Sequence, residues 1–186
     1  ITMLAIILTG SALIREREHG TLEHLLVMPV TAFEIMVSKI WSMGLVVLLA
    51  SGMSLTFVIQ GLLKVPVEGS VLLFLAGTAL HLFAVTSMGI FLATIAQNMP
   101  QLGMLLILVL MPMQMLSGGM TPRESMPEIV RTVMMIAPTT HFVEFSQAIL
   151  YRGAGMEVVW RPFLWIAGIG MTLFLITLAR FRKTVT

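Results

Sequence analysis

The 186-residue chain contains no cysteine and no aspartate, and only 11% of its residues are charged. The absence of cysteine excludes disulfide bonds, thiolate nucleophiles and cysteine metal ligands from this sequence. A soluble domain carries about 25% charged residues, more than twice the share found here. A net charge of +2 is also too small to indicate nucleic-acid binding. The composition therefore argues against a soluble globular enzyme and against a nucleic-acid partner.

Long apolar runs take the place of the missing charges. Apolar residues make up 58% of the chain, and the mean hydropathy is +0.99. A helix needs about 20 apolar residues to cross the hydrocarbon core of a membrane. The runs predict an all-α, polytopic helical membrane protein embedded in lipid, with about five crossings in one domain over residues 1–186. The expected spans are residues 1–14, 40–63, 70–95, 102–117 and 162–180.

The first apolar run has neither a basic leader nor a cleavage site, so it does not resemble a signal peptide. We expect it to be the second half of a helix, and the chain to be the C-terminal part of a longer protein truncated at its N-terminus. Five crossings put residues 15–39 and the C-terminus on one side. Because Arg180, Arg182 and Lys183 cluster at the end of the last run, that side is predicted to be the cytoplasm.

The segment 15–39 holds the densest charge in the chain. Thr21 is a suitable N-cap before a helical stripe of leucines, which predicts a short amphipathic helix on the membrane surface. Thr31 and Glu34 have the spacing of a capping box, so a second helix is expected from about Ala32 into the next span. Charges of both signs favour a protein partner, where complementary charges set the register. An ordinary surface helix is the alternative.

Two stretches resemble a known family. REREHGTLEHLLVMPVTAFEIMVSK resembles the cytoplasmic loop of ABC-2 type transporter permeases, the daunorubicin-resistance-like exporters. SGGMTPRESMPEIVRTVMMIAPTTHFVEFSQAIL is similar to that family's region before its last span. In the family the loop forms a coupling helix that fits a groove on a separate ATP-binding subunit. By position, the coupling residues implied here are Glu16, Glu18, Gly20, Thr21, Leu22, Glu23 and Leu26.

The resemblance implies a membrane-spanning permease subunit of an ATP-binding cassette exporter in a bacterial inner membrane. ATP hydrolysis would reside in the partner ATPase, and the permease would act as a homo- or heterodimer. The chain itself has no G-x-x-x-x-G-K-[ST] motif to cradle phosphates and no hydrolase motif, so we expect neither enzyme activity nor a bound cofactor. No set of metal ligands is expected either, since His19 and His24 have no further ligand nearby.

Four residues are candidates for a substrate pathway. His81 is the only titratable group inside a full expected span, and such groups are often functional. Gln114, Met113 and Met115 lie in a methionine-rich stretch that could contact varied apolar substrates. The simpler interpretations are a hydrogen bond from His81 to a neighbouring helix and packing filler for the methionines.

The long segment 118–161 is predicted to carry two helices on the extracytoplasmic side. Thr121 to Glu124 has the spacing of a capping box, and a competing start lies at Glu128. Pro138 is expected to end the first helix, and the second is expected from Thr140 to Tyr151. The pair either rests at the membrane interface or forms a re-entrant hairpin, and the short span before it, with Pro112 inside, favours re-entry.

Two other functions stay open. An ion- or proton-coupled secondary carrier usually places carboxylates near the bilayer midplane, but residues 40–63 and 70–95 contain no Glu, Lys or Arg. A membrane scaffold without transport activity is the other alternative. The sequence does not identify a substrate.

Overall fold

The computed structural model describes residues 1–19 and 31–185, with side chains as far as Phe181. Every regular element within these ranges is a helix, which confirms the all-α fold class. Three helices are long and apolar enough to cross a membrane: Ala32–Leu62, Val71–Ile95 and Met156–Phe181. The total of five crossings stays a prediction.

The helices follow the expected order along the chain. Their bounds are α1 Thr2–Glu18, α3 Ala32–Met53 with its π-helical continuation η1 Ser54–Leu62, α4 Val71–Ile95, α5 Met99–Met115, η2 Arg123–Ser125, α6 Glu128–Val133, η3 Met134–Ile136, α7 Pro138–Arg152 and α8 Met156–Val185.

Two local predictions about helix boundaries can be compared directly with these bounds. The capping box is present, because the Thr31 hydroxyl accepts from the Glu34 amide at 3.3 Å and the Glu34 carboxylate accepts from the Thr31 amide at 2.7 Å. The helix that follows runs without a break from Ala32 into the apolar span, as expected. Pro112 lies inside α5, which continues beyond it and ends at Met115.

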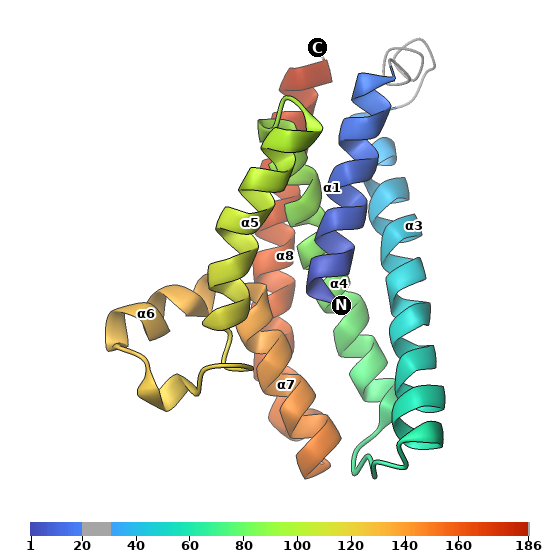
Figure 1. Cartoon of the computed structure of the whole chain (residues 1–186), viewed down its shortest axis with the longest axis vertical. Coiled ribbons are helices and arrows are strands. Elements are labelled where there is room, and N and C mark those ends of the chain that lie inside the picture. The colour runs from blue at the N-terminus through green and yellow to red at the C-terminus, as the bar shows by residue number, and fades with distance from the viewer. Residues whose placement is uncertain (20–30, 186) are drawn as a thin grey trace.

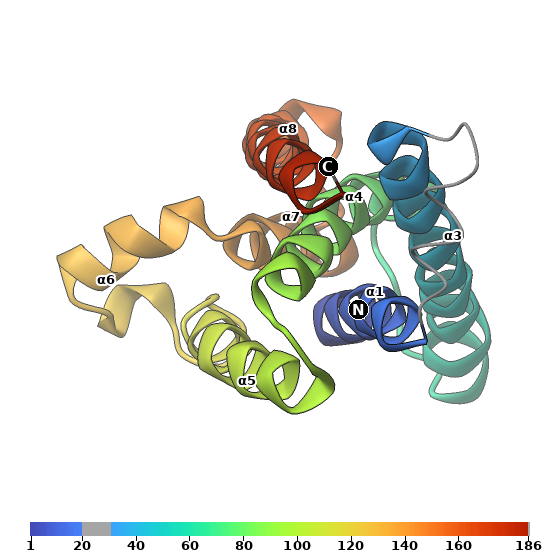
Figure 2. The same ribbon diagram turned by 90° about the horizontal axis from the view of Figure 1, so that it is seen from above.

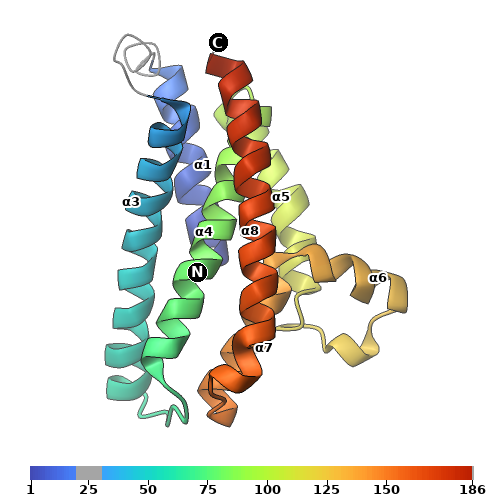
Figure 3. The same ribbon diagram turned by 180° about the vertical axis from the view of Figure 1, so that it is seen from behind.

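The central helix of the bundle is α4, which contacts α1, α3, α7 and α8 (Figures 1 and 2). α5 lies at one side against α1 and α4, and α3 lies on the opposite side (Figure 2). The end of α1 and the C-terminus lie at the same end of the bundle, and the α7–α8 junction lies at the other (Figures 1 and 3). This arrangement agrees with the common side expected for residues 15–19, residues 31–39 and the end of α8.

The backbones of α1 and α4 cross at two glycines. A Cβ atom on Gly89 would lie 2.9 Å from the carbonyl oxygen of Ile6, and one on Gly10 would lie 3.2 Å from the carbonyl oxygen of Gly89. Small residues let membrane helices approach closely enough for dense packing. The fully buried side chains of Leu13 and Ile90 belong to the core that forms around this crossing.

The segment 118–161 divides into two unlike parts. α7 is part of the bundle, where the fully buried Phe145 ring makes edge contacts with Phe142 at 5.3 Å and Phe163 at 5.2 Å. α6 has no buried residue and projects from the side of the bundle (Figures 1 and 3). The two expected helices are therefore present, but they do not form a matched pair.

The expected capping box at Thr121 was wrong. Only the three-residue helix η2 forms there, without a side-chain cap, and the longer helix begins at Glu128 behind Pro127. Pro122 and Pro127, five residues apart, restrict the backbone between them, so no continuous helix can start at the earlier site.

Large apolar side chains cover the outside of the bundle. Trp41, Phe57, Leu62 and Leu72 are each more than 70% exposed. A soluble monomer rarely exposes so much apolar surface, whereas lipid chains cover it at no cost. The outer surface therefore agrees with a position inside a membrane.

We expect Gly89→Val to lower the stability of the bundle, because its side chain would collide with the backbone of α1. Overpacking of this kind costs about 1–3 kcal/mol. The measurement is the apparent Tm of the purified protein in detergent. Gly103→Val is the matched control, since nothing lies within 4 Å of a Cβ atom at that position. Equal Tm values for the two variants would contradict the close crossing.

Candidate functional site

The last turn of α1 carries charged side chains directly before the segment predicted to couple to a partner. Lys39 on α3 donates to the carboxylate of Glu16, and the two side chains are 12% and 33% exposed. Partial burial makes this ion pair stronger than one at a fully exposed surface. It joins the end of α1 to the first turns of α3.

Arg17 binds the end of a different helix. Its guanidinium donates to the backbone oxygens of Ala93 at 3.0 Å and Ala96 at 2.7 Å. These two residues lie in the last turn and at the C-cap of α4, where carbonyl groups have no partner within the helix and carry partial negative charge. Arg17 therefore satisfies and neutralises the C-terminal end of α4.

Glu18 makes the complementary contact with the helix that comes next. Its Oε1 accepts from the backbone N–H of Met99 at 3.1 Å, and Met99 is the first residue of α5. A carboxylate is favourable at a helix N-terminus for the same electrostatic reason that a cation is favourable at a C-terminus. We call the contacts of Glu16, Arg17 and Glu18 the α1 clamp.

The α1 clamp gives intramolecular partners to two residues that were predicted to contact an ATPase. Glu16 and Glu18 bond to α3 and α5, and their role at a partner surface stays a prediction. The remaining predicted coupling residues lie outside the described residues: Gly20, Thr21, Leu22, Glu23 and Leu26.

Sequence reasoning missed Arg17 and Lys39 as functional residues. The signal for Arg17 was available, because an arginine in the last turn of an apolar helix often binds carbonyl groups at a helix end. The sequence could not indicate that the carbonyl groups belong to a helix 76 and 79 residues further along the chain.

His81 lies fully buried at the middle of α4. One ring nitrogen, Nε2, is 2.9 Å from the hydroxyl oxygen of Thr2, and the ring stacks on Phe142 with centroids 4.2 Å apart. This confirms the simpler interpretation, a hydrogen bond to a neighbouring helix. A role in a substrate pathway stays a prediction.

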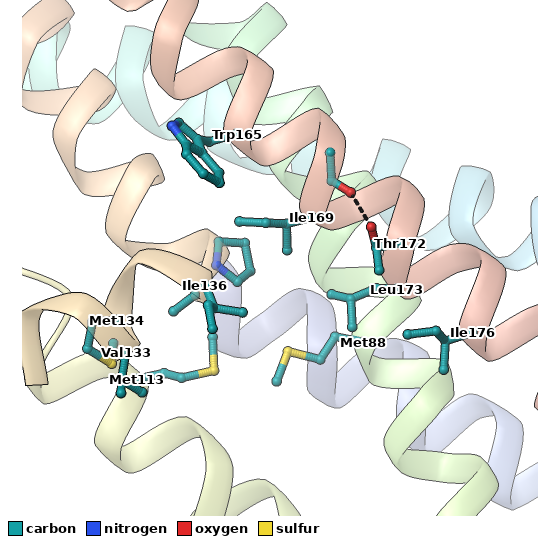
Figure 4. Close-up of a pocket in the computed structure, with 13 residues that line it drawn as sticks. Met88, Met113, Val133, Met134, Ile136, Trp165, Ile169, Thr172, Leu173 and Ile176 are labelled. Atoms are coloured by element: carbon teal, nitrogen blue, oxygen red, sulfur yellow. Dashed lines mark hydrogen bonds between the residues drawn. The ribbon is translucent and has the colours of Figure 1, made fainter. Parts of the chain in front are cut away.

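A cavity of about 700 Å³ lies between α8, η3 and the end of α5 (Figure 4). Of the four candidate pathway residues, only Met113 lines it. Met115 is 54% exposed outside the cavity, so the structure does not bring the four residues together. Trp165 and Gly168 line the same cavity and were missed, because only the packed arrangement brings η3 against α8.

Two other methionines and one leucine of α5 face outward at helical spacing. Met104, Leu108 and Met111 are each at least 60% exposed. Packing within this chain therefore does not explain these positions. Within residues 1–19 and 31–185, no three His or Glu side chains lie close enough together to hold a metal ion.

The described residues form a helical bundle with an apolar exterior, and three of its helices are long and apolar enough to cross a membrane. The family model described as ABC-2 type transporter matches residues 1–151. The chain belongs to this family.

Individual relatives agree with the family. The chain is 68% identical over 185 residues to the inner membrane transport permease YhhJ of Escherichia coli K12, a match that covers 100% of this chain and 50% of the relative. It is 27% identical over 184 residues to the probable multidrug ABC transporter permease YbhR of the same organism, covering 99% of this chain and 50% of the relative. The chain thus spans about half the length of the curated relatives it matches.

We expect Arg17→Gln to loosen the junction between α4 and α5. The substitution removes the charge and the paired donors from a helix end, and hydrogen bonds to charged groups contribute about 1.5–3 kcal/mol. Hydrogen exchange should accelerate at the amides of residues 96–99. Arg15→Gln is the control, since Arg15 lies on the same turn with an exposed side chain. Unchanged exchange in Arg17→Gln would exclude a mechanical role for the α1 clamp.

Proposed function

We propose that the chain is the membrane-spanning permease part of an ATP-driven exporter, in which a separate ATPase subunit pushes on residues 15–39. The observation that carries this proposal is the α1 clamp, which joins the end of α1 to three other helices. The proposal places residues 15–39 and the C-terminus in the cytoplasm of a bacterial cell, with five crossings in the inner membrane.

The clamp provides a physical route for such a push. Residues 20–30 connect the end of α1 to the start of α3, so any force on them acts on both helices. Glu16 and Lys39 hold these two helices together, and Arg17 and Glu18 extend the connection to α4 and α5. Charge-assisted bonds are short and directional, so they transmit a displacement rather than absorb it.

The proposal also includes a re-entrant position for residues 118–152, the segment expected on the extracytoplasmic side. α7 begins beside the end of α5 and packs on α4 and α8, while α6 projects sideways (Figure 1). Backbone that leaves a helix at membrane depth needs cover from protein or a cavity. We propose that residues 118–152 re-enter the membrane, with the turn between η3 and α7 at the deepest point.

The proposed permease acts as a dimer, as the family implies. The outward face of α5 is apolar over its whole length, with Met104, Leu108 and Met111 exposed. Flexible thioether side chains adapt to irregular partner surfaces. We propose that a second permease copy covers this face.

The coupling interface is tested with Leu22→Arg/Leu26→Arg. If the two leucines enter a groove on the ATPase, two buried charges should abolish co-purification of the ATPase and ATP-dependent transport, because unpaired buried charges cost several kcal/mol. Leu63→Arg/Val65→Arg is the control, as both residues are exposed at the opposite end of the bundle. Normal ATPase yield and normal transport in the first variant would refute the proposed interface.

The dimer is tested with single cysteines at Met104, Leu108 and Met111. Disulfide bonds need Cα atoms about 4.4–6.8 Å apart, so a two-fold contact on α5 should give a dimer after mild oxidation at one or more of these positions. The 186 residues contain no cysteine of their own. Met171→Cys on the exposed side of α8 and the unsubstituted protein serve as controls. Cross-linking only at position 171 would contradict the proposed face.

A further inference from the structure

The cavity beside α8 has no part in the coupling proposed above, and the side chains that line it are mostly apolar. Its walls come from α8, from the stretch Val133–Pro138, from Met113 on α5 and from Met88 on α4 (Figure 4). At about 700 Å³ it lies within the range of pockets that hold small ligands, about 300–1,000 Å³.

Apart from the Thr172 hydroxyl group and the Trp165 indole N–H, the side chains that line the cavity are apolar. The hydroxyl group of Thr172 donates to the backbone oxygen of Gly168 at 2.8 Å, so its proton is already bonded inside the wall (Figure 4). Because most of the wall is apolar, a polar ligand group placed here would lose more hydrogen bonds to water than it gains, which costs free energy. The cavity therefore suits a hydrocarbon chain.

The dimensions of the α8 wall match one leaflet of a membrane. The wall extends from Trp165 to Ile176, which corresponds to about 16 Å at the rise of an α-helix. Half of a hydrocarbon core about 30 Å thick is about 15 Å. Trp165 and Ile176 both lie inside the membrane-spanning candidate Met156–Phe181, and each is about half exposed. The cavity is therefore open on the outer side of the bundle.

The positively charged Arg161 lies on the same face of α8 as the cavity wall, closer to the α7–α8 junction. Arg161 lies one turn before Trp165, at the spacing that places two side chains on one side of a helix. Its guanidinium lies 5.5 Å from the Trp160 ring centroid. Tryptophan and arginine side chains are typical of the level of the lipid headgroups. An exposed guanidinium at this level can bind a phosphate group.

We propose that this cavity holds one acyl chain of an anionic phospholipid from the leaflet on the α6 side, with the phosphate group at Arg161. The lipid fills the space between α8 and η3 and supports the turn that enters α7. The inference requires the membrane position of α8 but not the ATPase.

Gly168 offers a direct way to fill the cavity. Nothing lies within 4 Å of a Cβ atom built at this position, so Gly168→Phe places a ring into open space rather than into a neighbouring helix. Gly103→Phe is the matched control, because that position is equally open and does not line the cavity. Thr172→Phe, on the same wall, is the second variant if Gly168→Phe does not fold.

The experiment uses the intact protein in lipid nanodiscs that contain phosphatidylglycerol with a photoactivatable group on one acyl chain. After illumination, cross-linked peptides should map to residues 165–176 and 133–138 in the unsubstituted protein and in Gly103→Phe. Labelling at these residues should fall by about tenfold in Gly168→Phe, a change equivalent to about 1.4 kcal/mol. Arg161→Gln should remove the preference for phosphatidylglycerol over phosphatidylcholine carrying the same group.

Two results would overturn the proposal. The first is equal labelling of residues 165–176 in Gly168→Phe, Thr172→Phe and Gly103→Phe. The second is no labelling of these residues in the unsubstituted protein, which would mean that a second copy, another helix or nothing occupies the cavity. Neither result depends on transport or on ATPase binding, so each is distinguishable from a failure of the proposed exporter function.

Discussion

The bundle depends on the hydrogen bonds that charged side chains at the end of α1 make with the C-terminal end of α4 and the N-terminal end of α5. The last carbonyl groups of α4 and the first N–H group of α5 have no partners within their own helices. Arg17 and Glu18 provide these partners from one turn of a third helix. Because the same turn leads into residues 20–30, the interaction that stabilises the α4–α5 junction also lies next to the segment expected to meet a partner.

Close packing around α4 gives that junction a rigid support. The glycine crossing brings the backbone of α1 against α4, and His81 joins the two helices again through Thr2. On the other side, the Phe145 ring fixes α7 against α4 and α8. Dense interiors deform little, so a displacement of α1 must move its neighbours with it. The cavity beside α8 lies where this dense packing ends.

Local patterns were predictable where all the interacting groups lie within a few residues. The capping box of Thr31 and Glu34 formed as expected because it needs only one turn of helix. The box expected at Thr121 failed because Pro122 and Pro127 restrict the same short stretch. For the candidate site, the sequence left two interpretations of His81 open, a substrate pathway and a hydrogen bond to another helix. Its partner Thr2 lies 79 residues away, and nothing local identifies it. The contrast between Met113 in the cavity and Met115 outside it likewise needs the rotation of α5 in the bundle.

The sequence by itself determined the all-α class, the membrane environment and the order of the helices, because hydrophobic runs and caps are properties of neighbouring residues. Its two charged and proline-bearing stretches also pointed to the family. Only the tertiary structure decided that Glu16, Arg17 and Glu18 reach three different helices, and that η3 and α8 enclose a cavity. These are contacts between segments far apart in the chain, and their geometry follows from how whole helices pack, which no local pattern encodes.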